Sequence, residues 1–281
     1  MTNLDRPDLT LLYAPGDRPH LVDKAFATMA DTVIIDLEDA VAPSGKEFAR
    51  NGLAQLLERH RGRRVQVRVN ALGTPWATFD LEAVASMPAN VGVRIPKVTD
   101  PSEVLYVAAA VGNRALHLLV ESAAGVEAAY EVARAHPQVA SLGLGEADLR
   151  SDLGVDDDAG LIFARSRVVN AARAAGLPAP SMSVYPNLVN EDGLARSCAD
   201  GRKLGFMGRA AIHPRQLAVI VAAFAPSSAE VERAQRVVEA VRNALEAGSG
   251  TLVLPDGSFL DVAMVERARR TIALAERIAH R

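Results

Sequence analysis

Short apolar runs alternate with longer amphipathic segments through the first 225 residues of the chain. Segments between the apolar runs carry the 3.6-residue periodicity of helices. The predicted helices are His20–Ala30, Lys46–Arg59, Trp76–Ser86, Pro101–Val111, Gly125–Ala135, Leu161–Ala175 and Leu194–Lys203. The apolar runs predict eight strands: Thr10–Ala14, Thr32–Leu37, Val65–Asn70, Val91–Ile95, Ala115–Val120, Val139–Gly145, Ser181–Tyr185 and Gly208–Ile212.

A strand–helix alternation repeated in this way is typical of a parallel sheet, and eight strands favour closure into a TIM (β/α)8 barrel. An open, doubly wound sheet is the alternative. A GxGxxG phosphate loop after the first strand would have supported that alternative, and the sequence has none there. We therefore expect the closed barrel.

The chain continues well past the eighth predicted strand. Residues 227–246 and 262–279 have helical patterns, and glycines with a turn-like Pro255-Asp256-Gly257 separate them. We expect a catalytic barrel over residues 1–225 and a C-terminal helical extension over residues 226–281. The apolar faces of the extension pack on its own barrel or on a neighbouring subunit.

Composition narrows the class of protein. A net charge of −3 gives no electrostatic basis for binding nucleic acid or an anionic membrane. Cys198 is the single cysteine, so an intrachain disulfide is impossible and a reducing compartment fits. The N-terminus lacks the apolar core of a signal peptide, and the longest apolar stretch, residues 217–226, is too short to span a bilayer. We expect a cytoplasmic protein.

Acidic residues follow two successive buried strands, at the end where the active site of a barrel lies. The fifth strand ends on Glu121, and the sixth is followed by Glu146 and Asp148. Hard cations such as Mg²⁺ take carboxylate oxygens as ligands, so this pattern indicates a divalent metal site. For either residue alone, the simpler interpretation is stabilisation of the next helix at its N-terminus.

The third strand alternates valines with polar residues, which places its polar side chains on one face. Since helices cover the outside of a barrel, Gln66, Arg68 and Asn70 should point inward. Arg68 lies near the mouth, where a planar guanidinium suits a substrate carboxylate. Asp36, Arg94 and His117 also point inward in this interpretation, and we expect them to form structural pairs inside the barrel.

Several stretches, taken in order, resemble one enzyme family. They are Tyr13–Pro19, Ile34–Val41, Val67–Asn70, Arg94–Lys97, Leu119–Ser122, Gly145–Leu149 and Ala211–Pro214. Together they resemble the citrate lyase beta-subunit-like CoA ester lyases of the HpcH/HpaI aldolase/citrate lyase family, with malyl-CoA and citramalyl-CoA lyases as relatives. The similarity runs from about Leu11 to about Ala279.

The resemblance implies a TIM barrel that uses Mg²⁺ to cleave a 3-hydroxyacyl-CoA into an acyl-CoA and a 2-oxo acid. Glu121 and Asp148 match the metal-binding carboxylates, and Glu121 also contacts substrate. Arg68 matches the arginine that binds the substrate acid and takes part in catalysis. Arg18 and Lys24 match positions that contact the phosphates of CoA.

The resemblance also concerns the C-terminal extension. Asp261 resembles a catalytic acid that this segment lends to the active site of a neighbouring subunit, which implies a homotrimer or homohexamer. Two positions depart from the family pattern: the first acid of Gly145–Leu149 is displaced by one residue, and Ala124 stands where an arginine is common. Substrate identity is what these departures leave open.

Two other functions stay open on the sequence. One is a metal-dependent aldolase that acts on free 2-oxo acids. The other is a partner-dependent citrate lyase beta subunit that acts on a thioester of an acyl carrier protein. Arg18 and Lys24 favour a CoA thioester over a free acid, because phosphate-bearing ligands need cations nearby.

Overall fold

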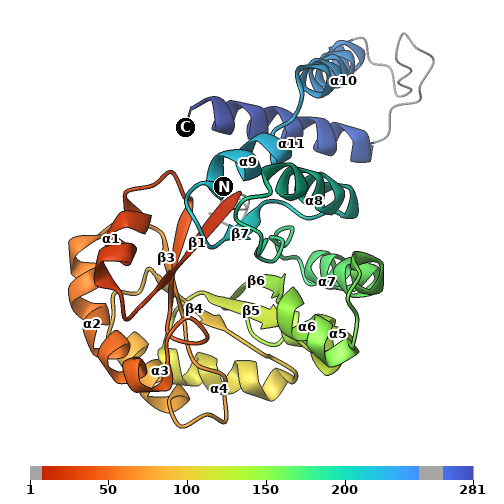
Figure 1. The fold of residues 1–281 in the computed structure, drawn as a ribbon. Coiled ribbons are helices and arrows are strands. Elements are labelled where there is room, and N and C mark those ends of the chain that lie inside the picture. Colours follow the sequence, from red (N-terminus) through yellow and green to blue (C-terminus); the bar gives the residue numbers. More distant parts are fainter. Residues whose placement is uncertain (1–7, 247–261, 281) are drawn as a thin grey trace. The chain divides into compact units, whose positions relative to one another are not determined.

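The computed structural model describes residues 8–246 and 262–280. They separate into two compact units, Met1–Ala223 and Phe224–Arg281. The first unit contains a parallel sheet with helices around it (Figure 1). The second contains two long helices. Among the described helices, none is long and apolar enough to cross a membrane.

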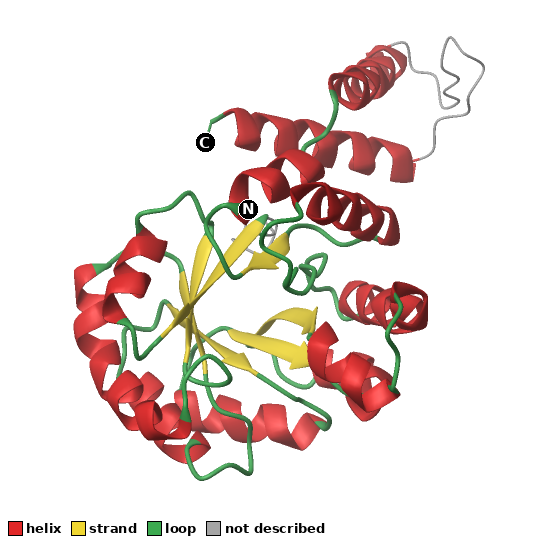
Figure 2. Cartoon of the chain, in the orientation of Figure 1, coloured by secondary structure: helices red, strands yellow, loops and turns green. Residues whose placement is uncertain are grey.

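Seven strands form the sheet, all paired in parallel, in the order β6-β5-β4-β3-β2-β1-β7. They are β1 (Thr10–Pro15), β2 (Thr32–Asp36), β3 (Val65–Arg68), β4 (Val91–Ile95), β5 (Leu116–Val120), β6 (Val139–Leu144) and β7 (Arg209–Ala211). Figure 2 shows the strands on the inside and the helices on the outside of this unit.

Helices connect the strands in sequence order. They are α1 (Pro19–Phe26), α2 (Lys46–Arg59), α3 (Ala77–Ala85), α4 (Pro101–Val111), α5 (Ala123–Ala133), α6 (Glu146–Leu153), α7 (Ile162–Ala174), α8 (Glu191–Leu204) and α9 (Gln216–Phe224). Short 3-10 turns, η2 (Pro43–Gly45) and η3 (Asp158–Leu161), precede α2 and α7. The start of α4 shows why a helix begins at this point of the sequence. Asp100 and Glu103 form a capping box around Pro101, which provides acceptors for main-chain amides that the first turn leaves unpaired.

The prediction of a closed eight-stranded TIM barrel was wrong, because the sheet is an open half-barrel that ends at β6 and β7. The predicted strand at residues 181–185 makes one isolated bridge, in which the Met182 amide donates to the Gly208 oxygen at 2.9 Å. Pro180 and Pro186 bracket this segment, and a proline has no amide to extend a ladder. On its other side, the Ser183 hydroxyl accepts the Glu146 amide at 3.2 Å instead of pairing with β6.

The register of the sheet places a row of polar residues across its strands. Asp36, Arg68, Arg94, His117 and Ser141 are successive partners from β2 to β6. Arg68 donates to Asp36, and a His117 ring nitrogen lies 2.8 Å from the Ser141 hydroxyl. Valine side chains at alternate positions pack into the core at 0–1% exposure, as at Val67 and Val91. The polar row therefore lies on one face of the sheet, and these valines pack into the core on the other.

The second unit is a pair of packed helices, α10 (Ser228–Glu246) and α11 (Val262–Ala279). Ala234 and Val237 of α10 and Ala268 of α11 form its buried centre, with Val265 and Ile272 packed against it. Small residues at the centre let the two backbones approach closely. The helical patterns predicted for this part of the sequence are thus accounted for by a helix pair.

Gly208 precedes β7 with a φ of 79°, and a β-carbon there would stand 2.6 Å from the Leu9 Cα. We expect Gly208→Ala to lower the free energy of unfolding by at least about 1–3 kcal/mol, because it combines backbone strain with a clash. The matched control is Gly52→Ala in α2, where a β-carbon would meet nothing within 4 Å. That change should stabilise the fold by about 0.4–1 kcal/mol. Urea unfolding of both variants measures the difference, and similar shifts would contradict the prediction.

Candidate active site

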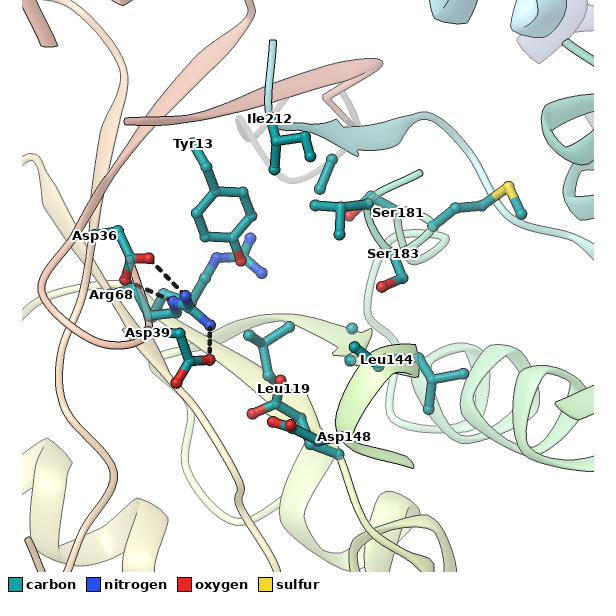
Figure 3. A pocket seen from close by; sticks show the side chains of 18 of the residues that line it. Tyr13, Asp36, Asp39, Arg68, Leu119, Leu144, Asp148, Ser181, Ser183 and Ile212 are labelled. Atoms are coloured by element: carbon teal, nitrogen blue, oxygen red, sulfur yellow. Dashed lines mark hydrogen bonds and ion pairs between the residues drawn. The ribbon is translucent and has the colours of Figure 1, made fainter. Parts of the chain in front are cut away.

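A pocket of about 360 Å³ lies at the carboxyl ends of the strands. Figure 3 shows labelled lining side chains from several elements, including Tyr13, Asp36, Arg68 and Asp148. Glu121, directly after β5, and Arg94, on β4, also line it. The parallel strands bring these residues together, since all their carboxyl ends reach the same edge of the sheet.

Arg68 is held by acidic groups on three sides. Its Nε and Nη2 donate to the two carboxylate oxygens of Asp36 at 2.8 and 2.6 Å, and Nη1 lies 2.8 Å from Glu38 Oε2 and 3.4 Å from Asp39 Oδ2. The guanidinium also lies 5.1 Å from the ring centre of Tyr13. Burial acts to lower the pKa of Arg68, but the hydrogen bond and charge of Asp36 outweigh it and raise that pKa overall. Arg68 is thus a fixed positive charge in the pocket.

Lys97 follows β4 with a φ of 55°, a left-handed conformation that non-glycine residues seldom adopt. This turn aims the Lys97 amide at Glu121 Oε2, 2.9 Å away. Its ammonium lies 2.7 Å from Glu38 Oε1 and 3.4 Å from Asp148 Oδ2. Burial opposes the charge, yet the hydrogen bond to Glu38 raises the pKa of Lys97 above its usual range. Such strained residues cluster at functional sites.

The two carboxylates expected to bind metal both reach the pocket. Glu121 is 6% exposed, and burial, followed by the charge of Glu38, raises its pKa to about 7. Asp148 lies in the first turn of α6 with a side chain that is 43% exposed. Gly145 has to be a glycine here, because a β-carbon would collide with the Glu121 carboxylate.

The donor set of this pocket fits Mg²⁺. Among the described residues, no cluster of three or more His, Cys, Asp or Glu side chains is arranged to hold a metal. Mg²⁺ does not require one, since it commonly uses one or two carboxylates together with waters and substrate oxygens. Glu121 and Asp148 are therefore suitable ligands for a hard cation.

Glu146 has a different role from Asp148. The Arg165 side chain on α7 grips both Glu146 carboxylate oxygens at 2.8 Å, and its Nη1 lies 3.1 Å from Asp158. Arg165 is buried, and Glu146 is not among the residues that line the pocket. The acid that is displaced in the sequence thus fixes α6 to α7, while Asp148 faces the pocket.

The remaining expected site residues lie elsewhere. Arg18 immediately precedes α1 and Lys24 lies in its last turn; both are exposed and neither lines the pocket. Asp261 lies outside the described residues. The contacts of Arg18 and Lys24 with CoA, and the role of Asp261, stay predictions.

Sequence reasoning missed two features of the pocket. Lys97 entered the sequence analysis only as the last residue of the stretch Arg94–Lys97, whereas its ammonium contacts Glu38 and Asp148 in the pocket. Tyr13, whose half-buried ring lies beside Arg68, was noted only as part of a motif. The position of Lys97 two residues past the end of β4 was a usable signal, because the acids of the site also follow strand ends.

Comparisons with known proteins identify the family of the chain. Residues 9–214 match the model of the family described as HpcH/HpaI aldolase/citrate lyase. The chain belongs to this family. It is 38% identical over 286 residues to a (3S)-malyl-CoA thioesterase of Cereibacter sphaeroides, which covers 99% of this chain and 98% of the relative. It is 34% identical over 283 residues to a citrate lyase subunit beta of Escherichia coli, covering 95% and 93%.

Solved structures of family members agree with the fold. The chain resembles the protein CitE from Mycobacterium tuberculosis in complex with magnesium, acetoacetate and coenzyme A, with a TM-score of 0.81 and 31% identity over 97% of this chain and 100% of the other. It also resembles a citrate lyase beta subunit of that organism complexed with oxaloacetate and magnesium, with a TM-score of 0.69 and 33% identity, covering 80% and 100%. These enzyme relatives make the chain an enzyme of this family and support a function of the CoA-ester lyase type.

His117 offers a test of the electrostatics beneath the pocket. Burial, followed by the charge of Arg94, lowers its pKa to about 3. Between pH 3 and 6.5, His117 binds a proton in the unfolded chain but not in the folded chain. The free energy of unfolding therefore falls as the pH falls through this range. We expect His117→Gln to remove this one-proton dependence, whose slope reaches about 1.4 kcal/mol per pH unit.

Urea unfolding between pH 4.5 and 7 measures this difference between wild type and variant. The exposed His20 provides the control, and His20→Gln should keep the pH dependence of the wild type. Parallel loss of stability in wild type and His117→Gln would show that His117 titrates in the folded chain.

Proposed function

We propose that this enzyme is a Mg²⁺-dependent lyase that cleaves a 3-hydroxyacyl-CoA into an acyl-CoA and a 2-oxo acid. The observation that supports this most is the convergence of Glu121, Asp148 and Arg68 on one pocket. The names of the relatives point the same way, since solved CitE structures contain magnesium and coenzyme A. The substrate belongs to the citryl-, malyl- or citramalyl-CoA type.

Each side chain has a task that its surroundings suit. Glu121 and Asp148 would hold Mg²⁺, which supplies Lewis-acid stabilisation of the oxygens at the bond that breaks. Arg68 stabilises negative charge on the substrate as that charge shifts toward the thioester. Its anchoring by Asp36 fixes the guanidinium before substrate arrives. Asp261 exchanges the proton at the carbon that the cleavage leaves negatively charged.

The proposal includes contacts beyond the pocket. Arg18 and Lys24, exposed at the two ends of α1, bind the phosphates of CoA. The protein assembles as a homotrimer or homohexamer in which Asp261 of one subunit serves the site of the next. Native mass spectrometry measures the number of subunits.

A second candidate is hydrolysis of the thioester. It is favoured by the 38% identity to an enzyme named (3S)-malyl-CoA thioesterase. A panel of malyl-, citramalyl- and citryl-CoA separates the two activities. Cleavage of the carbon–carbon bond releases an acyl-CoA and a 2-oxo acid, whereas hydrolysis releases free CoA and a hydroxy acid. The same panel tests citrate lyase beta activity if a carrier-protein thioester is included.

We expect Glu121→Ala to abolish Mg²⁺ binding in calorimetry and turnover in the same panel, because Asp148 alone leaves too few protein ligands. Glu127→Ala is the control, since this exposed glutamate lies on the following helix, α5. It should bind Mg²⁺ like the wild type. If the Glu121→Ala variant binds Mg²⁺ as tightly as wild type, Glu121 is not a ligand of the metal.

We expect Arg68→Lys to keep the fold and to lower kcat by about 10²-fold or more, the scale for removing one preorganised stabilising group. Lysine keeps the charge but cannot grip Asp36 with two donors. The control is Arg50→Lys, which changes another partly buried arginine–aspartate pair, with Asp80 at 3.4 Å, outside the pocket lining. It should keep near wild-type turnover. A melting temperature that collapses in Arg68→Lys together with activity would support a purely structural role.

A further inference from the structure

Arg94 on β4 is a buried guanidinium that no described carboxylate neutralises. It is 4% exposed and lines the pocket. Its one hydrogen bond among the described residues runs from Nε to Gln66 Oε1 at 2.9 Å, and none of their carboxylate oxygens lies within 4.0 Å of its nitrogens. Burying a charge without a partner is costly. The sequence led us to expect Arg94 in a structural pair inside the barrel, but no described carboxylate pairs with it.

The other well-buried arginines differ from Arg94 either in their partners or in their access to the pocket. Arg68 and Arg165 each pair with a carboxylate. Arg114 donates to main-chain oxygens. Arg209 donates to the Ser197 hydroxyl and pairs with no described carboxylate either, but it does not line the pocket. Among the described residues, Arg94 thus combines burial, lack of an anion and access to the pocket.

The surroundings of Arg94 orient its charge without cancelling it. The Nε of Arg94 donates to Gln66. Its two terminal nitrogens have no protein acceptor among the described residues, and neither of them is fully buried. His117, its partner on β5, stays neutral because its pKa is about 3. Gly143 lies beside the guanidinium and adds no side chain there, since a β-carbon at this position would stand 3.9 Å from Nη1. Two terminal nitrogens that line a pocket without a protein acceptor suit a carboxylate.

We propose that Arg94 binds a carboxylate of the substrate other than the one beside Glu121 and Asp148. Both positions line one pocket of about 360 Å³, together with the apolar Leu119 and Leu144. A short carbon chain with an acid at each end fits them. The substrate is then a 3-hydroxyacyl thioester whose 2-oxo acid product is a short dicarboxylic acid. This inference rests on the proposed function and names its substrate class.

The test compares two 2-oxo acids that differ by one carboxylate, oxaloacetate and pyruvate, each titrated into the Mg²⁺-saturated protein. Wild type should bind oxaloacetate at least about tenfold more tightly. Arg94→Met should weaken oxaloacetate binding by roughly 10- to 100-fold, the value of a hydrogen-bonded charge, and change pyruvate binding less than about threefold. Arg94→Lys should give an intermediate loss and replaces the methionine variant if that variant does not fold.

Arg209→Met is the matched control, because Arg209 is equally buried but lies outside the pocket lining. It should leave the oxaloacetate-to-pyruvate ratio unchanged. Mg²⁺ titration without any acid should give the same affinity in wild type and in the Arg94 variants, which separates the anion site from the metal site. Equal binding of both acids by wild type, or an equal loss for both acids in Arg94→Met, would overturn the inference.

The outcome is also separable from that of the proposed function. A ratio that depends on Arg94, in a protein that cleaves no thioester, supports the anion site and refutes the lyase. If the protein cleaves a thioester but its oxaloacetate-to-pyruvate binding ratio does not depend on Arg94, only the anion site is refuted.

Discussion

The geometry of the pocket depends on the Asp36 carboxylate. Asp36 is 1% exposed, and its oxygens accept from Arg68 and from the amides of Glu38 and Ala40. One buried acid therefore fixes both the arginine on the neighbouring strand and the loop that carries Glu38. Removing it would free a guanidinium and a loop at the same time.

The same network reaches the proposed metal ligands through Lys97. Glu38, set by the loop, binds the Lys97 ammonium, while the Lys97 amide binds Glu121. The left-handed backbone at Lys97 makes both contacts possible from one residue. Burial, followed by the like charge of Glu38, raises the pKa of Glu121, and the Lys97 ammonium beside Glu38 opposes that repulsion. A cation in this position has a structural as well as a chemical effect.

The sequence predicted those features that depend on residues close together along the chain. The apolar runs located the first six strands, and acids at strand ends identified Glu121 and Asp148 as pocket residues. The closed barrel failed because closure depends on pairing along the whole of residues 181–185, and the prolines on either side limit that segment to a single bridge. The strained turn at Lys97 also escaped prediction, because a positive φ outside glycine has no sequence signature.

Arg94 shows why pairing cannot be inferred from an inward-facing position alone. In the row Asp36, Arg68, Arg94, one acid is followed by two guanidiniums on successive strands. Neighbouring strands are roughly 4.8 Å apart, so Asp36 is about twice that distance from the Arg94 strand, and its two oxygens are taken by Arg68. The register itself thus leaves one buried cation without an acid, beside another cation. The fold carries the cost of that charge, and a carboxylate that enters the pocket would offset it.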